Sequence, residues 1–328
     1  PPAPPLNETL DAILPLPVDL RLTRIGADDM QVALDGTTLP LRSFGMGIEL
    51  QGRQLAITDL ELQAPPGQLS GRLGLTLAGD YELDTSLYWA YRAEDDTLPP
   101  LAGQLDARGD LNTLQIEHRL QEPAAVSTDG SVTTGLADSL NGADGPLPLA
   151  LDLQHSASSL VPEELGLSIP ALTGWRIDTL NLTTRGEPDD LAIDGDMQIR
   201  ALLPGEGDST PFNVSTRWNS TLQGNTWQLG QLRMEAEDNG LEISGQVDWS
   251  GPLTVNADLR LNAPDPGAIY PLPAGLELQA LQTDAELQLT LPDSGLSGEV
   301  LLDGLTAELN GQTLSGGGRL ALQDSALQ

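Results

Sequence analysis

His118 and His155 are the side chains best suited to metal or acid–base chemistry in a chain without cysteine. They are too few and too far apart in the sequence to form a metal-binding motif. His118 follows Leu114 and Ile116 with the same parity, and His155 follows Leu153 in the same way. Residues of one parity share a face of a β-strand. We therefore predict that both imidazoles lie near an apolar sheet face.

Four aspartates that follow the second histidine in the sequence could suggest a calcium site. Asp189, Asp190, Asp194 and Asp196 lie close together in the sequence, but their spacing does not match a calcium-loop consensus. Acidic clusters in such an acidic chain are usually solvated turns. We expect neither a metal nor a cofactor here.

Catalytic motifs are also missing from the sequence. Carboxylates are so numerous that no pair can be selected for glycoside hydrolysis. Ser297 lies in Leu-Ser-Gly, which lacks the full Gly-x-Ser-x-Gly pattern, and the glycines after Ser315 precede no lysine. We expect a protein that is not an enzyme; a polysaccharide-cleaving enzyme remains a third class, and it would need a cleft with paired carboxylates.

Composition favours an all-β fold rich in turns. The chain has 35 glycines and 25 prolines, and aromatic residues make up only 3% of it, so its apolar content is aliphatic. The formal net charge is −33, from 48 acidic and 15 basic residues, and every basic residue is arginine. Such a charge repels polyanions, so nucleic acid is excluded as a partner.

Apolar and polar residues alternate along extended segments. The alternation is strict from Asp284 to Leu291, and odd positions are largely apolar from Leu69 to Tyr91. Strands of this kind have one dry and one wet face. The sequence therefore predicts an antiparallel β-sheet with one aliphatic surface.

Four short segments with the pattern Leu-x-Gly-x-x-Leu/Trp predict hairpins. They span residues 34–39, 50–55, 222–227 and 309–314. Asn310-Gly311 and Asp35-Gly36 suit a type I′ turn, whereas the other two need only the glycine at positive φ.

Helix is expected only as short plugs, from Asn7 to Leu14 and around Pro162 to Leu165. Residues 126–148 are rich in Ser, Thr, Gly and Asp and are predicted as a flexible loop. It would separate a first β-segment, residues 1–125, from a second, residues 149–328, continuous with the first. No run of 18 apolar residues is present.

Several segments resemble the TamB family, the anchored periplasmic subunits of the bacterial translocation and assembly module, and more loosely their AsmA-like relatives. The likeness covers most of the chain. It rests on residues 50–55 (LQGRQL), 69–73 (LSGRL), 103–111 (GQLDARGDL) and 309–316 (LNGQTLSG). The resemblance implies a long, curved β-sheet folded like a taco around an open hydrophobic groove that bridges the inner and outer membranes.

The resemblance also implies a function, a location and partners. It points to the transfer of glycerophospholipids in outer-membrane biogenesis, without catalytic residues. It implies a periplasmic protein, anchored to the inner membrane by an N-terminal segment outside this chain. A TamA-like partner of the outer-membrane assembly family would bind through other regions. A chaperone-like assembly factor and a β-sandwich adhesin or binding array remain as alternatives.

Alternating apolar positions are the candidates for a lipid-lining surface. We expect the groove to be lined by Leu69, Leu73, Leu75, Leu77, Leu83, Leu87, Leu151, Leu153, Leu180, Leu182, Val255, Leu259, Leu276, Leu278, Leu287, Leu289, Leu305 and Leu309.

Overall fold

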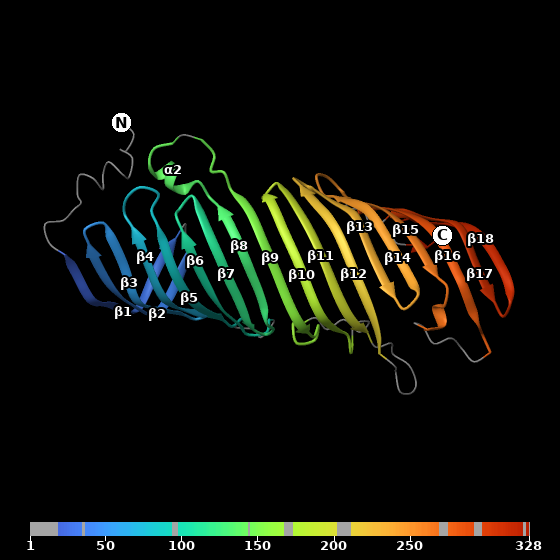
Figure 1. Ribbon diagram of the computed structural model, residues 1–328, viewed down its shortest axis with the longest axis horizontal. Coiled ribbons are helices and arrows are strands. Elements are labelled where there is room, and N and C mark those ends of the chain that lie inside the picture. Colours follow the sequence, from blue (N-terminus) through green and yellow to red (C-terminus); the bar gives the residue numbers. More distant parts are fainter. Residues whose placement is uncertain are drawn as a thin grey trace. The chain divides into compact units, whose positions relative to one another are not determined.

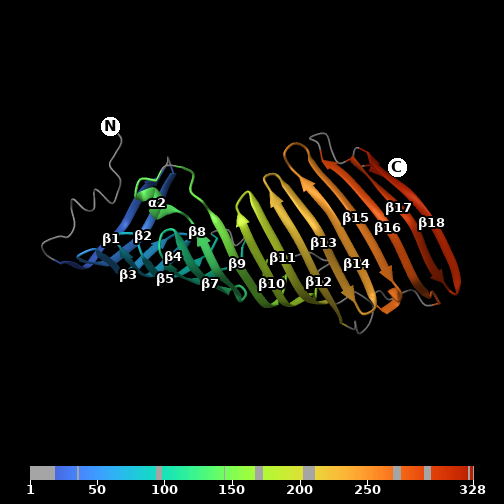
Figure 2. The same ribbon diagram turned by 45° about the horizontal axis from the view of Figure 1, so that its top comes forward.

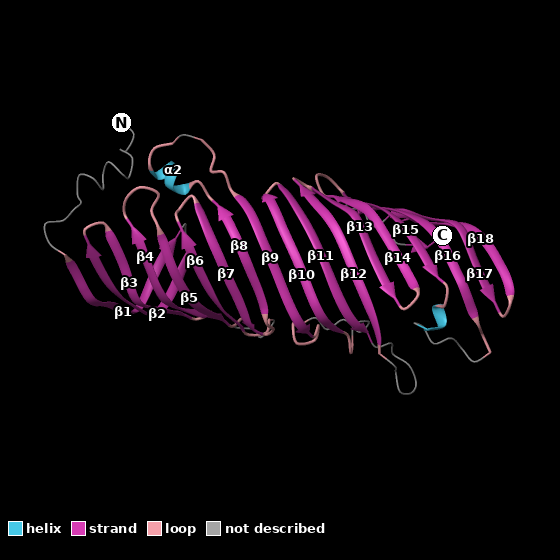
Figure 3. Cartoon of the chain, in the orientation of Figure 1, coloured by secondary structure: helices cyan, strands magenta, loops and turns pink. Residues whose placement is uncertain are grey.

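The computed structural model describes residues 19–34, 37–93, 98–143, 145–166, 173–201, 211–268, 275–291, 297–323 and 326–327. Contacts along the chain divide it into two compact units, Pro1–Leu167 and Ser168–Gln328. Strands dominate the described part of both units, and helix is confined there to two short pieces (Figure 3).

The first unit is an antiparallel sheet in which each strand pairs with the next one along the chain (Figure 1). Its strands are β1 (Leu20–Leu34), β2 (Thr37–Gln51), β3 (Gln54–Ala64), β4 (Gly67–Thr76), β5 (Leu83–Tyr91), β6 (Leu101–Gly109), β7 (Thr113–Glu122), β8 (Val126–Thr133) and β9 (Ala150–Leu160). One short helix, α2 (Leu136–Leu140), lies between β8 and β9.

The second unit repeats this plan, and Figure 2 shows its strands side by side. Its elements are β10 (Arg176–Glu187), β11 (Asp190–Ala201), β12 (Phe212–Gln223), β13 (Thr226–Ala236), β14 (Asn239–Asp248), β15 (Leu253–Ala263), the 3-10 turn η2 (Pro266–Ala268), β16 (Leu278–Leu291), β17 (Ser297–Leu309), β18 (Gln312–Gln323) and β19 (Ala326–Leu327). The predicted fold class, an all-β, curved antiparallel sheet, is confirmed.

Two-residue turns form where the hairpin pattern predicts them. Gly52 and Gly224 adopt φ of 59° and 54° in the turns after β2 and β12. Asn310 and Gly311 both have positive φ, 48° and 75°, as a type I′ turn requires. Asp35-Gly36 lies outside the described residues, as does the predicted helix Asn7–Leu14.

Bulges preserve the alternation over the longer strands. Asp59 in β3 and Ala280 in β16 have φ of 49° and 51°, and the strand register shifts beside each of them. An extra residue in one strand reverses its parity. Ile57 and Leu60 therefore share a face although three positions separate them in the sequence.

The segment predicted as a flexible loop, residues 126–148, is partly strand. Residues Val126–Thr133 form β8, which pairs with β7 and β9 over its whole length. A polar composition concealed this strand, because its apolar face carries only Val126, Val132 and small residues between them. A Cβ atom at position 130 would lie 2.0 Å from the Asp152 carbonyl oxygen, a clash that Gly130 avoids because it has no side chain. The contact-based division falls later, between Leu167 and Ser168.

The alternating segment from Leu69 to Tyr91 is two strands rather than one. β4 ends at Thr76 and β5 begins at Leu83. Tyr81 lies in the connection with φ of 56° and is 1% exposed. Its hydroxyl donates to Asn141 Oδ1 at 3.2 Å, just beyond α2. The short helix thus closes over one end of the sheet, as a plug does. The predicted helical turn near Pro162 is a single turn, in which the Leu165 amide donates to the Val161 carbonyl.

Large aliphatic side chains are not sealed under a second layer. Among the described residues, Tyr81 is the only large side chain that is fully buried, and most buried apolar residues are alanines. A closed sandwich would bury leucine and isoleucine between its two sheets. Each unit therefore consists of an open sheet with an accessible aliphatic face.

Candidate functional site

Apolar side chains of the first unit line up across its strands. The register partners of Leu73 and of Leu75, followed from strand to strand, form rows perpendicular to the strands. We call the sheet surface that carries these rows the apolar face of the first unit. One row contains Leu50, Leu55, Leu75, Leu83, Gly109, Leu114, Val132 and Leu151. Another contains Ile48, Ile57, Leu73, Thr85, Ala107, Ile116, Gly130 and Leu153.

The second unit has an equivalent apolar face. One of its rows contains Leu182, Gly195, Trp218, Leu232, Ile243, Leu259, Ala285 and Leu302. A neighbouring row contains Gly245, Ala257, Leu287, Val300 and Leu320. Of these side chains, Leu302 and Leu320 are 38% and 45% exposed.

Charged side chains are kept off both faces. Along the described strands β4–β9 and β10–β18, no register position on an apolar face holds Asp, Glu or Arg. The charges lie on the opposite, polar face. An aliphatic surface without competing charge can take up hydrocarbon and exclude water.

Most of the predicted lining residues lie on these faces. The sheet register brings together Leu69, Leu73, Leu75, Leu83, Leu87, Leu151 and Leu153 in the first unit. It brings together Leu180, Leu182, Val255, Leu259, Leu278, Leu287, Leu289, Leu305 and Leu309 in the second. All of these are half-buried. Leu77 lies in the turn after β4, and Leu276, 43% exposed, precedes β16. Contact with lipid stays a prediction for every one of them.

Sequence reasoning missed further members of the apolar faces. Ile57, Ile116, Ile243 and Val300 occupy the same rows as the predicted leucines. Their parity relative to neighbouring apolar residues could have identified them, but bulges interrupt that parity in several strands.

Part of the second unit's apolar face is closed locally. Ile199, Val214 and Ala236 are buried at the ends of β11, β12 and β13, and Trp175 and Phe212 pack against them. This cluster resembles a small core rather than an accessible surface.

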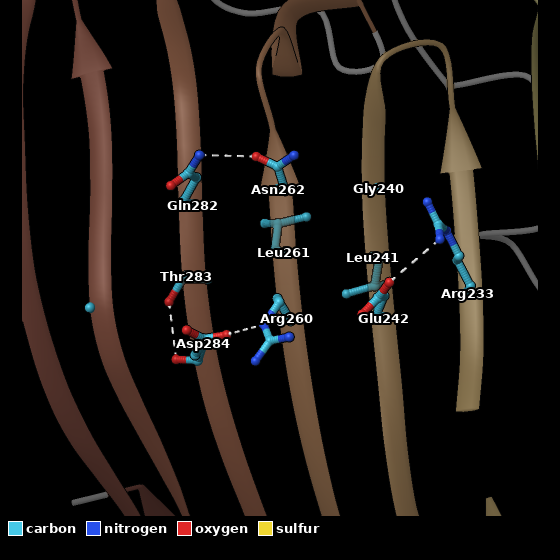
Figure 4. Close-up of a pocket in the computed structure, with 11 residues that line it drawn as sticks. Arg233, Gly240, Leu241, Glu242, Arg260, Leu261, Asn262, Gln282, Thr283 and Asp284 are labelled. Carbon is cyan, nitrogen blue, oxygen red and sulfur yellow. Dashed lines mark hydrogen bonds and ion pairs between the residues drawn. The ribbon is translucent and has the colours of Figure 1, made fainter. Parts of the chain in front are cut away.

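The polar face carries a ladder of ion pairs across neighbouring strands. Arg233 lies 3.9 Å from Glu242, and Arg260 Nε lies 2.9 Å from Asp284 Oδ1 (Figure 4). The hydrogen bond and the charge of Asp284 raise the pKa of the Arg260 guanidinium above its usual value. These side chains border an open hollow of about 550 Å³. Its cations are matched by carboxylates, so it offers no net positive charge to an anion.

Removing one of these ion pairs should have little effect. The side chains of Arg260 and Asp284 are 71% and 62% exposed, and exposed pairs contribute little to stability. We expect Arg260→Gln to leave the urea midpoint of unfolding and the amount of co-purifying lipid unchanged within error. A marked loss of lipid in this variant would indicate that lipid binds at the polar face and not at the apolar face.

The aspartate cluster gives no sign of a metal site. Asp196 lies on the polar face, where Oδ2 accepts a hydrogen bond from Asn181 at 3.0 Å. In the ranges that the structure describes, no three His, Asp or Glu side chains converge as metal ligands would. The described helices are also too short to cross a membrane.

Comparison with known families decides the relationship. The family model for the TamB N-terminal domain matches residues 2–328. The chain belongs to the TamB family. No curated protein and no solved structure was found to be similar to it.

TamB membership gives the chain a biological setting. TamB proteins act in the translocation and assembly module, are periplasmic and anchored to the inner membrane, and associate with a TamA-like partner. An open β-sheet with one aliphatic face fits the groove that the sequence resemblance implies for this family.

Proposed function

We propose that the apolar faces hold the acyl chains of glycerophospholipids and let them move along the rows of leucines between the inner and outer membranes. The protein would act without catalysis, as part of a longer anchored protein. The observation that carries this proposal is the combination of half-exposed aliphatic rows and the absence of charge from the same described faces.

The energetics explain why such a surface is needed. Each methylene removed from water contributes about 0.8 kcal/mol. Moving a phospholipid with roughly thirty methylenes through water with its acyl chains exposed would therefore cost more than ~20 kcal/mol of free energy. Continuous contact with aliphatic side chains removes most of this cost.

Uniform lining also favours movement over tight binding. Leucine, valine and alanine contact hydrocarbon without directional bonds, so neighbouring positions along a row bind a chain about equally well. Small residues such as Gly245 and Ala257 leave space between the larger side chains.

Mass spectrometry of lipids extracted from the purified chain tests the proposal. We expect glycerophospholipid to co-purify and to exchange with added lipid. If no lipid co-purifies and the chain takes up no short-chain phospholipid, it does not carry lipid. Co-purification of unfolded outer-membrane polypeptide in place of lipid would instead favour a chaperone-like assembly role.

A further inference from the structure

A tryptophan lies over a glycine of the neighbouring strand on the apolar face of each unit. In the second unit, Trp218 on β12 is the register partner of Gly195 on β11. A Cβ atom on Gly195 would lie 2.2 Å from Trp218 Cζ2 and 2.6 Å from both Cε2 and Cη2. The indole ring therefore occupies the space that a side chain on the neighbouring strand would fill.

The first unit has the same arrangement. Trp89 on β5 is paired with Gly103 on β6, where a Cβ atom would lie 3.0 Å from Trp89 Cε2 and Cζ2. The Trp89 Nε1 donates to His118 Nε2 on β7 at 3.3 Å, and the two rings stack with an interplanar angle of 10°. His118 pairs with Thr128, and Thr128 pairs with His155. Both imidazoles thus lie on the apolar face, which confirms the sequence prediction for them.

The local sequence directs Gly195 toward the tryptophan ring. It lies in β11 between Asp194 and Asp196, which are on the polar face opposite Asn219 and Arg217. Alternation then places the glycine on the apolar face. Gly195 has no positive φ that would require glycine. Glycine inside a strand often marks a place where another group approaches closely. The contact with the ring is therefore the reason for a glycine at this position.

The position of the ring keeps it from projecting above the sheet. Side chains in a strand stand roughly perpendicular to the sheet, so an indole in that orientation would rise above neighbouring leucines. Trp218 instead leans over β11 and is half-buried. The other large side chains of its row include Leu182, Leu232 and Ile243. The bulkiest side chain of the row is thus held level with its aliphatic neighbours.

We infer that Gly195 is a positioning residue that holds the Trp218 ring against the sheet, so that acyl chains move over the ring and are not obstructed by it. Gly103 does the same for Trp89 in the first unit. This inference rests on the proposed function and names residues that keep its path open. An aromatic ring also stabilises a strand that contains a glycine, so lipid loading and stability must be measured separately.

Gly195→Val tests the inference. The three atoms nearest to an added Cβ all belong to the Trp218 side chain and none to the backbone, so the ring must move while the strands stay paired. We expect phosphatidylcholine loading to fall about tenfold, the equivalent of about two methylenes that lose contact with the face. Loading is measured by mass spectrometry after incubation of the purified chain with phosphatidylcholine vesicles.

Gly318→Val is the matched control. Gly318 pairs with Leu302 in the same row, and a Cβ atom there meets nothing within 4 Å. The same side chain is added to the same face without displacing a ring, so loading should be unchanged.

A double variant separates obstruction by the ring from a defect in the strand. Gly195→Val with Trp218→Leu creates an aliphatic cross-strand pair like that of Leu287 and Val300. We expect it to restore loading to within about threefold of the wild type, and Trp218→Leu alone to load lipid equally well. A purely structural role for Gly195 predicts no such rescue. The urea midpoint of each variant checks its stability.

Fluorescence measures contact between the ring and lipid. Bromine on the acyl chains of phosphatidylcholine quenches indoles that the chains touch. The protein has five tryptophans, so the emission of Trp218 is the difference between the wild type and Trp218→Phe. We expect brominated phosphatidylcholine, but not the unbrominated lipid, to quench this emission.

The outcomes distinguish this inference from the proposed function. Full loading of a folded Gly195→Val variant, failure of the double variant to regain lipid, or Trp218 emission that bromine leaves unquenched would overturn the inference but not lipid carriage. If the valine variant does not fold, Gly195→Ala replaces it, with an expected loss of about threefold. If the wild type takes up no phosphatidylcholine, the inference and the proposed function both fail.

Discussion

Replacing Leu287 by Arg is expected to lower lipid loading roughly 100-fold while the sheet stays folded. Leu287 lies on the apolar face of β16, between Ala257 on β15 and Val300 on β17. An arginine in a hydrocarbon environment costs about 2.5–3.5 kcal/mol. Since 1.4 kcal/mol corresponds to tenfold in affinity, the chain should lose nearly all of its bound phospholipid. Quantitative mass spectrometry of lipid per mole of protein measures the effect.

Gln288→Arg is the matched control for this substitution. Gln288 follows Leu287 in the same strand, but its side chain is exposed on the polar face opposite Asn256 and Glu299. The same charge is introduced one residue away and on the other surface, so lipid loading should be preserved. Equal loading in both variants would show that the apolar face of β16 does not contact lipid.

Tyr81→Ala is expected to destabilise the first unit by about 3–5 kcal/mol, as measured by urea unfolding. Tyr81 is 1% exposed, and its hydroxyl bonds to Asn141 beyond α2. Asn141 in turn donates from Nδ2 to the Gly79 carbonyl at 3.1 Å. Truncation would leave a cavity between this turn and α2 and remove the bond that joins them.

Two further tyrosine variants separate the contribution of the Tyr81 hydrogen bond from that of its buried ring to the stability of the first unit. Tyr81→Phe keeps the ring and removes one hydrogen bond, so about 1 kcal/mol should be lost. Tyr88→Ala removes a ring that is 52% exposed on β5 and should change stability much less. If Tyr88→Ala and Tyr81→Ala were equally destabilising, α2 would not act as a plug through Tyr81.

These two sets of variants address different parts of the fold. The Leu287 pair examines a surface that is left accessible, whereas the Tyr81 variants examine a place where the sheet end is covered. A protein that carries lipid needs both, because an exposed aliphatic face is compatible with a stable fold only where other contacts hold the strands.

Local patterns in the sequence were sufficient for some of the strands and their turns. The alternation from Asp284 to Leu291 fixes which side chains share a face, because successive residues of a strand point in opposite directions. Asn310-Gly311 specifies its turn, because both residues tolerate positive φ. The placement of His118 and His155 with the leucines follows from the same parity.

Other features depended on contacts between distant residues. β8 was predicted as a loop, since its small polar residues become a strand only when β7 and β9 supply hydrogen-bond partners. Tyr81 shared the parity of the lining leucines, yet a turn and α2 bury it. Leu77 also shared this parity, but it lies in the connection that follows β4, which ends at Thr76.

The sequence by itself determined the all-β class, the two-faced strands and the separation of charge from aliphatic side chains, because these are encoded by neighbours in the chain. Only the tertiary structure decided that the aliphatic face stays open within each unit, and that His118, Thr128 and His155 share a row. Both depend on the register between strands and on the absence of a covering layer in the described units, and neither property is encoded by any one segment.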